Sequence, residues 1–202
     1  VRSEPQRIGI FGGTFDPPHN AHVDIARAAL QYANLDKVVF VVAANPPHKP
    51  HEEITDAEDR LAMVKAVLPN DAPFEASRLE IDRPGPSYTV DTLNELDEHY
   101  RGAAFFLIVG YDSLLDLPKW RNPEAILARA RLLVIPRPGE RKPPPPFVEG
   151  RYELLPFEER DLSSTEVRSR LEQGQPVRGL VPDGVCRVIK ARGLYGVDTE
   201  QS

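Results

Sequence analysis

Two glycines, a threonine and two histidines occur in one short segment near the N-terminus, GGTFDPPHNAH at positions 12–22. The segment follows an apolar run from Ile8 to Phe11 that predicts a buried strand, and it leads into a helical pattern. Glycines allow the backbone to approach a ligand closely, and the N-terminus of a helix favours negative charge. His19 and His22 add hydrogen-bond donors on one helical face. The segment therefore predicts a turn that binds phosphate.

The two histidines have other interpretations that the sequence leaves open. They could be metal ligands, but helical zinc pairs are usually four residues apart with a glutamate, and no third ligand is evident. They could also be a surface pair without a task. The segment lacks the lysine of a Walker A loop and the glycine spacing of a dinucleotide-binding loop. Its place between a strand and a helix favours donation to phosphate oxygens.

Hydroxyl residues also precede an arginine near the C-terminus, in SSTEVR at 163–168. Such a run is typical of a helix start, with Arg168 merely exposed to solvent. The same hydroxyls, the free N–H groups of a first helical turn and Arg168 could instead form an anion site. In a doubly wound fold this site could meet the N-terminal turn at the carboxyl edge of the sheet.

Asp112 and Trp120 are two further candidates for ligand contacts. Asp112 follows a predicted strand at 104–109, where a carboxylate can accept hydrogen bonds from ribose hydroxyls. Asp112 could equally cap a short helix at 113–117. Trp120 is the only tryptophan and lies in the polar loop PKWR at 118–121. It could pack in the core, but its polar loop favours stacking on the ring of a ligand.

Short β-branched runs alternate with helical patterns along the chain. Strands are predicted at 7–11, 37–43, 104–109 and 131–135, with weaker ones at 74–77 and 152–155. Helices are predicted at 19–32, 56–68, 89–100, 123–128 and 164–173. This alternation implies βαβ units, and so an α/β fold with a doubly wound parallel sheet. We predict a single domain over 1–202, with a core over about 1–160 and a small C-terminal helical part over about 161–195.

The composition excludes several classes of function. A net charge of −6 argues against broad binding to nucleic acid or to anionic membranes. Cys186 is the only cysteine, which excludes an internal disulfide and a zinc cluster built on cysteine. No apolar stretch approaches about 18 residues and the N-terminus shows no signal-peptide pattern, so we expect a soluble cytoplasmic protein.

Further motifs, in this order, carry a resemblance to a known family. They are PPHK at 46–49, PSYTVDTL at 86–93, GYDSLLDLPKW at 110–120 and PRPG at 136–139, besides the two segments above. Together they resemble the bacterial nicotinate-nucleotide adenylyltransferases, of the nucleotidyltransferase superfamily marked by a T/H-x-G-H signature. The resemblance covers nearly the whole chain. It implies a Rossmann-like, three-layer α/β/α fold and a reaction in which ATP and nicotinate mononucleotide give deamido-NAD and pyrophosphate.

The resemblance also implies roles for individual residues. The catalytic residues would be His19, His22 and Arg168, all acting at the ATP phosphates. The other ATP contacts would come from Phe11, Gly12, Gly13, Thr14, Lys49, Gly110, Asp112, Arg137, Ser164 and Thr165. Nicotinate mononucleotide would be held by Tyr88, Thr89, Trp120 and Arg121. Mg²⁺ would be delivered with ATP, without metal ligands from the protein.

Two positions depart from the family pattern. Ala21 stands where the signature usually has glycine, and its methyl group could crowd a close backbone approach. Tyr111 stands between Gly110 and Asp112, where a smaller residue is common, and could reshape the ribose contact. Neither departure removes a proposed chemical group, so we expect activity.

The motifs also permit other functions. A related adenylyltransferase or cytidylyltransferase could use nicotinamide mononucleotide or phosphopantetheine as its acceptor. A nucleotide-binding sensor would keep the pocket without turnover, although the intact His19, His22 and Arg168 argue against it. An RNA-binding synthetase-like domain is disfavoured by the acidic balance. The sequence does not fix the oligomeric state.

Overall fold

The computed structural model describes residues 4–46, 54–137, 139, 142–157 and 162–198. In this part of the chain, six parallel strands form one sheet in the order β3-β2-β1-β4-β5-β6. The strands are β1 Arg7–Gly13, β2 Lys37–Val42, β3 Phe74–Ser77, β4 Ala104–Gly110, β5 Ala130–Ile135 and β6 Tyr152–Leu154. The helices are α1 Asn20–Tyr32, α2 Ala57–Val67, α3 Leu79–Asp82, α4 Thr89–His99, α5 Tyr111–Asp116, α6 Pro123–Arg129, α7 Ser164–Glu172 and α8 Asp183–Arg192. Short 3₁₀ turns lie at η1 Leu117–Lys119, η2 Pro146–Val148 and η3 Leu194–Gly196.

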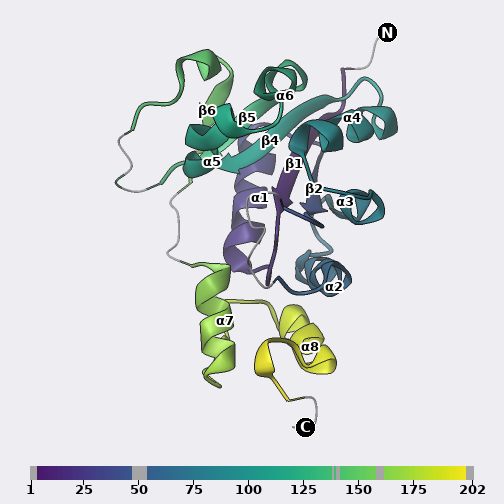
Figure 1. The fold of residues 1–202 in the computed structure, drawn as a ribbon, viewed down its shortest axis with the longest axis vertical. Coiled ribbons are helices and arrows are strands. Elements are labelled where there is room, and N and C mark those ends of the chain that lie inside the picture. Colours follow the sequence, from purple (N-terminus) through teal and green to yellow (C-terminus); the bar gives the residue numbers. More distant parts are fainter. Residues whose placement is uncertain (1–3, 47–53, 138, 140–141, 158–161, 199–202) are drawn as a thin grey trace.

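The central strands bury both of their faces, which explains their nearly continuous apolar runs. On β2, Val39 and Val41 belong to a core cluster that includes side chains of α4 and α6. Val38 and Phe40 point the other way, into a cluster that includes side chains of α1 and α2. Helices therefore cover both faces of the sheet (Figure 1), and the predicted Rossmann-like α/β/α fold is confirmed.

The strand order reverses beside β1, which lies between β2 and β4. In doubly wound sheets, ligands bind outside the carboxyl ends of the strands at such a reversal. The turn before α1 follows the carboxyl end of β1, and Gly110 is the last residue of β4. The fold thus brings the predicted phosphate turn and the predicted ribose segment to the same edge.

At one end of the molecule α8 packs against α2, and α7 contacts the η3 turn (Figure 1). A third apolar cluster joins Met63 of α2 to Val167 of α7 and to Val185 and Ile189 of α8. Gly184 makes this approach close, because a Cβ there would stand 2.5 Å from the carbonyl oxygen of Ala66. None of the helices in the described ranges is long and apolar enough to cross a bilayer.

The predicted elements are present with small shifts at their ends. All six strands are found within two residues of their predicted ends, and the five predicted helices within one. The short helix expected at 113–117 is wrong in its bounds, because α5 runs from Tyr111 to Asp116. The patterns do not predict α3 or the bounds of α8. In α8, an early glycine and the β-branched Val185, Val188 and Ile189 weaken the helical signal.

Candidate active site

The turn after β1 is held by aromatic packing and leaves one glycine open. A Cβ at Gly13 would stand 2.9 Å from the ring of Phe15, whereas Gly12 has nothing within 4 Å of that position. Phe11 is buried, and its ring packs against Phe15 and Phe40 at centroid distances of 5.6 and 5.4 Å. Only the main chain of Phe11 is therefore available to a ligand. Gly12 offers the close backbone approach that a phosphate requires.

His19 and His22 stack on each other at the start of α1. Their ring centroids are 3.8 Å apart, and His19 is 5% exposed. The Nδ1 atom of His22 accepts a hydrogen bond of 3.1 Å from the backbone N–H of His19. The proton of a neutral His22 must then be on Nε2, which leaves that N–H free to donate to a ligand. The Nδ1 atom of His19 is buried and has no hydrogen-bond partner among the described residues.

The stacked histidines are uncharged at neutral pH, because burial opposes the cationic form. Burial lowers the pKa of His19 from its ordinary 6.5 to about 4. Burial also holds the pKa of His22 well below 6.5, and the neighbouring His19 adds to this effect. In the free protein the pair therefore supplies neutral donors. In the described part of the chain, Arg60 and Arg168 supply the cationic charge that contacts the turn.

The SSTEVR segment contacts this turn, although about 150 residues separate the two in sequence. Ser164 Oγ donates to the carbonyl oxygen of Pro17 at 2.9 Å, and Arg168 Nη1 donates to that of Asp16 at 2.6 Å. Ser163 caps α7 by accepting a hydrogen bond from the N–H of Glu166. The interpretation as a helix start is therefore right. The same contacts place Ser164 and Arg168 beside the N-terminal turn, as the interpretation as an anion site requires.

At the end of β4, Asp112 does not cap a helix. The N-cap of α5 is Gly110, and Asp112 lies in the first turn, where it forms an ion pair with Arg137. Both side chains of this pair are more than half exposed. Tyr111, which departs from the family pattern, donates a hydrogen bond of 2.9 Å from its hydroxyl to the carbonyl of Lys142, away from Asp112. The ribose interpretation of Asp112 thus remains, with Arg137 as its neighbour.

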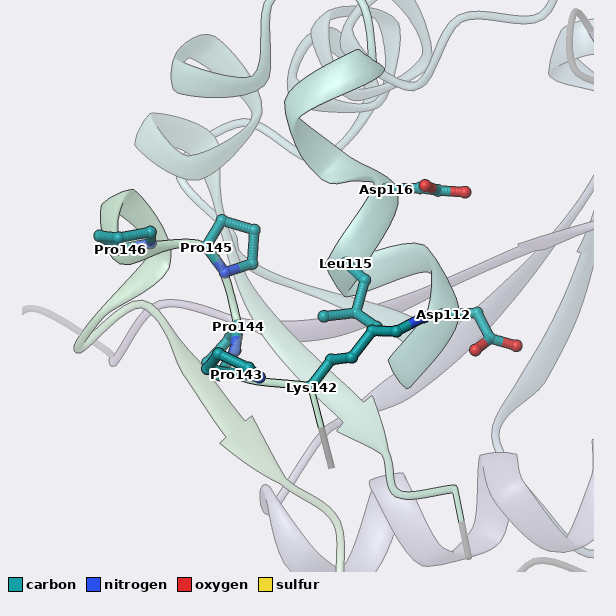
Figure 2. A pocket seen from close by; sticks show the side chains of 8 residues that line it. All are labelled: Asp112, Leu115, Asp116, Lys142, Pro143, Pro144, Pro145 and Pro146. Carbon is teal, nitrogen blue, oxygen red and sulfur yellow. The ribbon is translucent and has the colours of Figure 1, made fainter. Parts of the chain in front are cut away.

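A surface hollow of about 810 Å³ lies next to α5 (Figure 2). It is lined by Asp112, Leu115, Asp116, Lys142 and Pro143–Pro146. In Figure 2 the prolines lie to the left of α5, while both carboxylates extend to its right. Neither histidine nor Arg168 lines the hollow. It adjoins the predicted nucleoside end of the site and is separate from the phosphate turn.

The residues expected to bind the mononucleotide gather at the start of α4. Tyr88 is the N-cap of α4 and Thr89 its first residue. The guanidinium of Arg121 lies 4.7 Å from the centroid of the Tyr88 ring and 3.8 Å from Asp91. Trp120 is half-buried and packs, like Tyr88, against the core cluster on this face. Packing and ligand contact are therefore both open to Trp120.

The loop before α4 is fixed by hydrogen bonds to the end of β2. Ser87 Oγ accepts from the backbone N–H groups of Ala44 and Asn45 at 3.1 and 3.2 Å. The backbone N–H of Ser87 donates to the carbonyl of Asn45 at 3.0 Å. This fixes the start of α4 relative to the sheet. Lys49, expected near the phosphates, lies outside the described residues.

Arg60 is a part of the site that sequence reasoning missed. Arg60 is 1% exposed and donates to the carbonyls of Thr14, Ala43 and Thr55, each at 2.7 Å. It therefore ties the phosphate turn to the segment between β2 and α2. In the sequence it is one of several charged residues in a predicted helix, and nothing there distinguishes it from a surface arginine.

The remaining position is Ala21, the departure in the signature. Ala21 is buried within the first turn of α1.

Among the described residues, no group of three or more His, Cys, Asp or Glu side chains is placed to hold a metal ion. The metal interpretation of the histidine pair therefore has no third ligand there.

Comparisons with known proteins agree with this arrangement. The cytidylyltransferase-like family matches residues 10–170. A nicotinate-nucleotide adenylyltransferase of Bacillus subtilis is 38% identical over 192 residues, which cover 94% of this chain and 98% of the relative. A relative from Shouchella clausii, named as a probable enzyme of the same kind, is 40% identical over 195 residues, with 96% and 100% covered.

The fold also matches solved structures. One is the Plasmodium falciparum nicotinic acid mononucleotide adenylyltransferase complexed with NaAD, with a TM-score of 0.78 at 18% identity. The alignment covers 96% of this chain and 100% of that one. A match at this identity supports the fold alone, while the family follows from the sequence matches. The chain belongs to the cytidylyltransferase-like family and, within it, to the nicotinate-nucleotide adenylyltransferases.

Proposed function

We propose that this protein transfers the adenylyl group of MgATP to the 5′-phosphate of nicotinate mononucleotide. The products are deamido-NAD and pyrophosphate, and the reaction is a step in NAD biosynthesis. The observation that carries the proposal is the meeting of two anion-binding elements. Arg168 and Ser164 of α7 bind the carbonyls of Asp16 and Pro17, in the turn that leads into the histidine pair.

In this reaction an oxygen of the mononucleotide phosphate attacks the α-phosphorus of ATP, and the bond from that phosphorus to the pyrophosphate oxygen breaks. The attacking phosphate is already largely a dianion at neutral pH, because its second pKa is about 6. No general base and no protein nucleophile are needed. Catalysis then depends on positioning two polyanions and on stabilising the charge that grows on pyrophosphate.

The phosphate-side residues suit this task. The Nε2–H of neutral His22 would donate to a phosphate oxygen without a proton to lose. Arg168 keeps further N–H groups beyond those that donate to the carbonyl of Asp16 and to Thr165 Oγ1. The hydroxyl of Thr165 and the first N–H groups of α7, including the backbone N–H of Ser164, would hold the outer phosphates, because the O–H of Ser164 already donates to Pro17. Mg²⁺ enters with ATP as part of the substrate.

The other end of ATP would lie along β4 and β5. Gly110 has nothing within 4 Å of a Cβ position, so a sugar can approach the backbone there. Asp112 would accept hydrogen bonds from ribose hydroxyls, and its ion pair with Arg137 would orient the carboxylate. Both side chains are exposed enough to rearrange around a nucleoside.

The acceptor would bind at the start of α4. The first N–H groups of that helix, near Tyr88 and Thr89, would receive the nicotinate carboxylate, with Arg121 as the nearby cation. Trp120 would stack on the pyridine ring. A neutral amide would leave these donors without their anion, so the acid is the expected substrate. The proposal includes a cytoplasmic location, where the lone thiol of Cys186 would stay reduced.

The test is pyrophosphate release by the purified protein, with ATP and each candidate acceptor in parallel. The acceptors are nicotinate mononucleotide, nicotinamide mononucleotide and phosphopantetheine. We expect release with nicotinate mononucleotide at a rate well above that with the other two. Release with phosphopantetheine instead would mean a different transferase, and absence of release with every acceptor would favour a nucleotide sensor.

A further inference from the structure

Four segments of the chain meet at Asp16, in the middle of the phosphate turn. We propose that Tyr195 is a positioning residue for Arg168 and acts through Asp16, so that the C-terminal part of the chain sets the geometry of the pyrophosphate-binding groups. The proposal rests on the proposed function, because it gives Arg168 the task of holding pyrophosphate.

Both carboxylate oxygens of Asp16 accept a hydrogen bond from a distant segment of the chain. Its Oδ1 accepts a hydrogen bond of 2.5 Å from the hydroxyl of Tyr195, which is 179 residues away in sequence. Its Oδ2 accepts one of 3.2 Å from the backbone N–H of Thr55. Asp16 is 4% exposed, so losing either partner would leave a buried carboxylate oxygen unsatisfied. These contacts fix where the residue sits.

The main chain of the same residue holds the cation of the site. The carbonyl oxygen of Asp16 accepts the 2.6 Å hydrogen bond from Arg168 Nη1, and the next carbonyl, of Pro17, accepts from Ser164. Because carboxylate and carbonyl belong to one residue, a shift of the carboxylate moves the point from which the guanidinium is held. An error of about 1 Å in such a group can cost on the order of a hundredfold in rate.

Tyr195 is itself held firmly, which makes it a suitable anchor. It follows the end of α8 at Gly193 and packs against the third apolar cluster, with its hydroxyl 3.9 Å from Met63 Sδ. Its φ is 55°, a left-handed conformation that a tyrosine adopts only where the surroundings impose it. The cluster also contains Val167, one residue before Arg168. Tyr195 therefore hydrogen-bonds to Asp16 and packs on the same apolar cluster as the residue that precedes Arg168.

The opposing view is that Tyr195 only stabilises the fold. The two views differ in a double-mutant cycle of Tyr195→Phe and Arg168→Lys, measured by calorimetric titration with magnesium pyrophosphate. Calorimetry reports affinity separately from the fraction of protein that is folded, so partial unfolding lowers the stoichiometry and not the affinity. Arg168→Lys keeps the positive charge and a measurable affinity for pyrophosphate. A lysine ammonium lacks the planar guanidinium, which can donate to the Asp16 carbonyl and to an anion at the same time.

We expect Tyr195→Phe to weaken pyrophosphate binding about tenfold in the otherwise unchanged protein and less than twofold in the Arg168→Lys background. Tyr100→Phe is the matched control. Its hydroxyl also donates to a carboxylate, that of Glu75 at 3.0 Å, but next to the edge strand β3. That variant should leave pyrophosphate affinity unchanged in both backgrounds.

Two results would overturn the inference. One is unchanged pyrophosphate affinity in Tyr195→Phe, and the other is an equal loss in both backgrounds, which would make the role purely structural. The assay is independent of the acceptor, so its outcome is distinct from the test of the proposed function. Pyrophosphate binding to the unchanged protein without turnover of any acceptor would count against the function and not against the role of Tyr195.

Discussion

The two sides of the candidate site reach a fixed geometry by different routes. The phosphate side comprises Asp16, His22, Arg60, Arg168 and Tyr195. The acceptor side comprises Glu80, Arg83, Tyr88, Thr92 and Trp120. The longest side-chain hydrogen bonds of the phosphate side join residues 46, 152 and 179 positions apart. On the acceptor side, the bonds of Ser87 to the end of β2 span 42 and 43 positions, and the bonds among Glu80, Arg83, Thr92 and Glu95 span 9 and 12. The phosphate side therefore depends on the C-terminal part of the chain, whereas the acceptor side is held by one loop, one helix and the adjacent end of β2.

The acceptor side shows how a local network can do this work. Thr92 donates to the buried carboxylate of Glu80 at 2.5 Å and accepts from Arg83 at 3.0 Å. Arg83 in turn pairs with Glu95 at 2.6 Å. The network braces the start of α4 without a partner from the C-terminal helices. A change in the C-terminal part should therefore disturb the phosphates and leave the acceptor loop in place.

The largest expected effect is on stability, in Arg60→Met. The substitution removes the donor to three backbone carbonyls at a site that is 1% exposed. We expect the free energy of unfolding to fall by about 3–5 kcal/mol. Arg83→Met on the acceptor side should cost about 1 kcal/mol, because Arg83 is only partly buried. Urea unfolding of both variants measures the difference, and equal losses would contradict the contrast between the two sides.

The next effect is on turnover, in His22→Ala. The loss of the Nε2–H donor should lower kcat by about a hundredfold to a thousandfold, or roughly 2.7–4 kcal/mol in activation free energy. The matched control is His99→Ala, since His99 is exposed in the last turn of α4. Steady-state kinetics of pyrophosphate release would decide the matter. A kcat within threefold of the unchanged protein would remove His22 from the proposed machinery.

The sequence predicts the local features of the site better than the long-range ones. The glycine turn, the cap at Ser163 and the strand ends depend on neighbours in sequence, and the structure has them where the patterns place them. The partners of Arg60, Asp16 and Tyr195 depend on which distant segments the sheet brings together. No spacing rule encodes those pairs, because an arginine or a tyrosine reads the same on the surface and in the core.

The charge of the histidines shows the same limit. A histidine at a helix start before a phosphate site reads as a cation, and the sequence favours charge-assisted bonds there. The stack of His19 on His22 and the hydrogen bond to Nδ1 of His22 are local to the start of α1. The burial of both rings depends on the surrounding fold, and it makes the neutral form the stable one in the free protein.

The third prediction concerns pH and separates the two sides by sign. His19 has a pKa of about 4 in the folded protein against 6.5 for the exposed group. The unfolded chain binds the proton more readily, so the stabilisation is complete above about pH 6.5 and is lost as pH falls toward 4, by up to about 3 kcal/mol. Burial raises the pKa of Glu80 above its ordinary 4.5. The contribution of Glu80 to the free energy of unfolding therefore declines as pH rises from 4.5 through the raised pKa, which is the opposite sign.

Urea unfolding at pH 7.5, 6.0 and 5.0 would test this sign. His19→Gln should reduce the loss of stability between the first two values, because one of the two buried imidazoles is gone, while His22, whose pKa is also lowered, accounts for the remainder. Glu80→Gln should leave that loss in place, and so should His99→Gln, which changes an exposed ring. If His19→Gln retained the full slope, the acid sensitivity would have to come from other groups.

The smallest effect should come from Trp120→Ala, and its value lies in which substrate it touches. Trp120 packs, like Tyr88, against the core cluster of the acceptor side, to which neither the histidines nor Arg168 belongs. Loss of ring stacking should raise the KM for nicotinate mononucleotide roughly threefold to tenfold and leave the KM for ATP within twofold. Tyr32→Ala, which removes an exposed ring at the end of α1, is the control and should change neither KM.

Each outcome for Trp120→Ala bears on how separate the two sides are. A rise in the KM for nicotinate mononucleotide alone would mean that the acceptor side can be weakened without a loss of ATP binding on the phosphate side. The short-range hydrogen bonds of the acceptor side predict this result. An equal rise in both KM values would mean that Trp120 acts through the core cluster it shares with α4 and β4. In that case the two sides would respond as one unit, and the long-range hydrogen bonds of the phosphate side would not make its binding independent of the acceptor side.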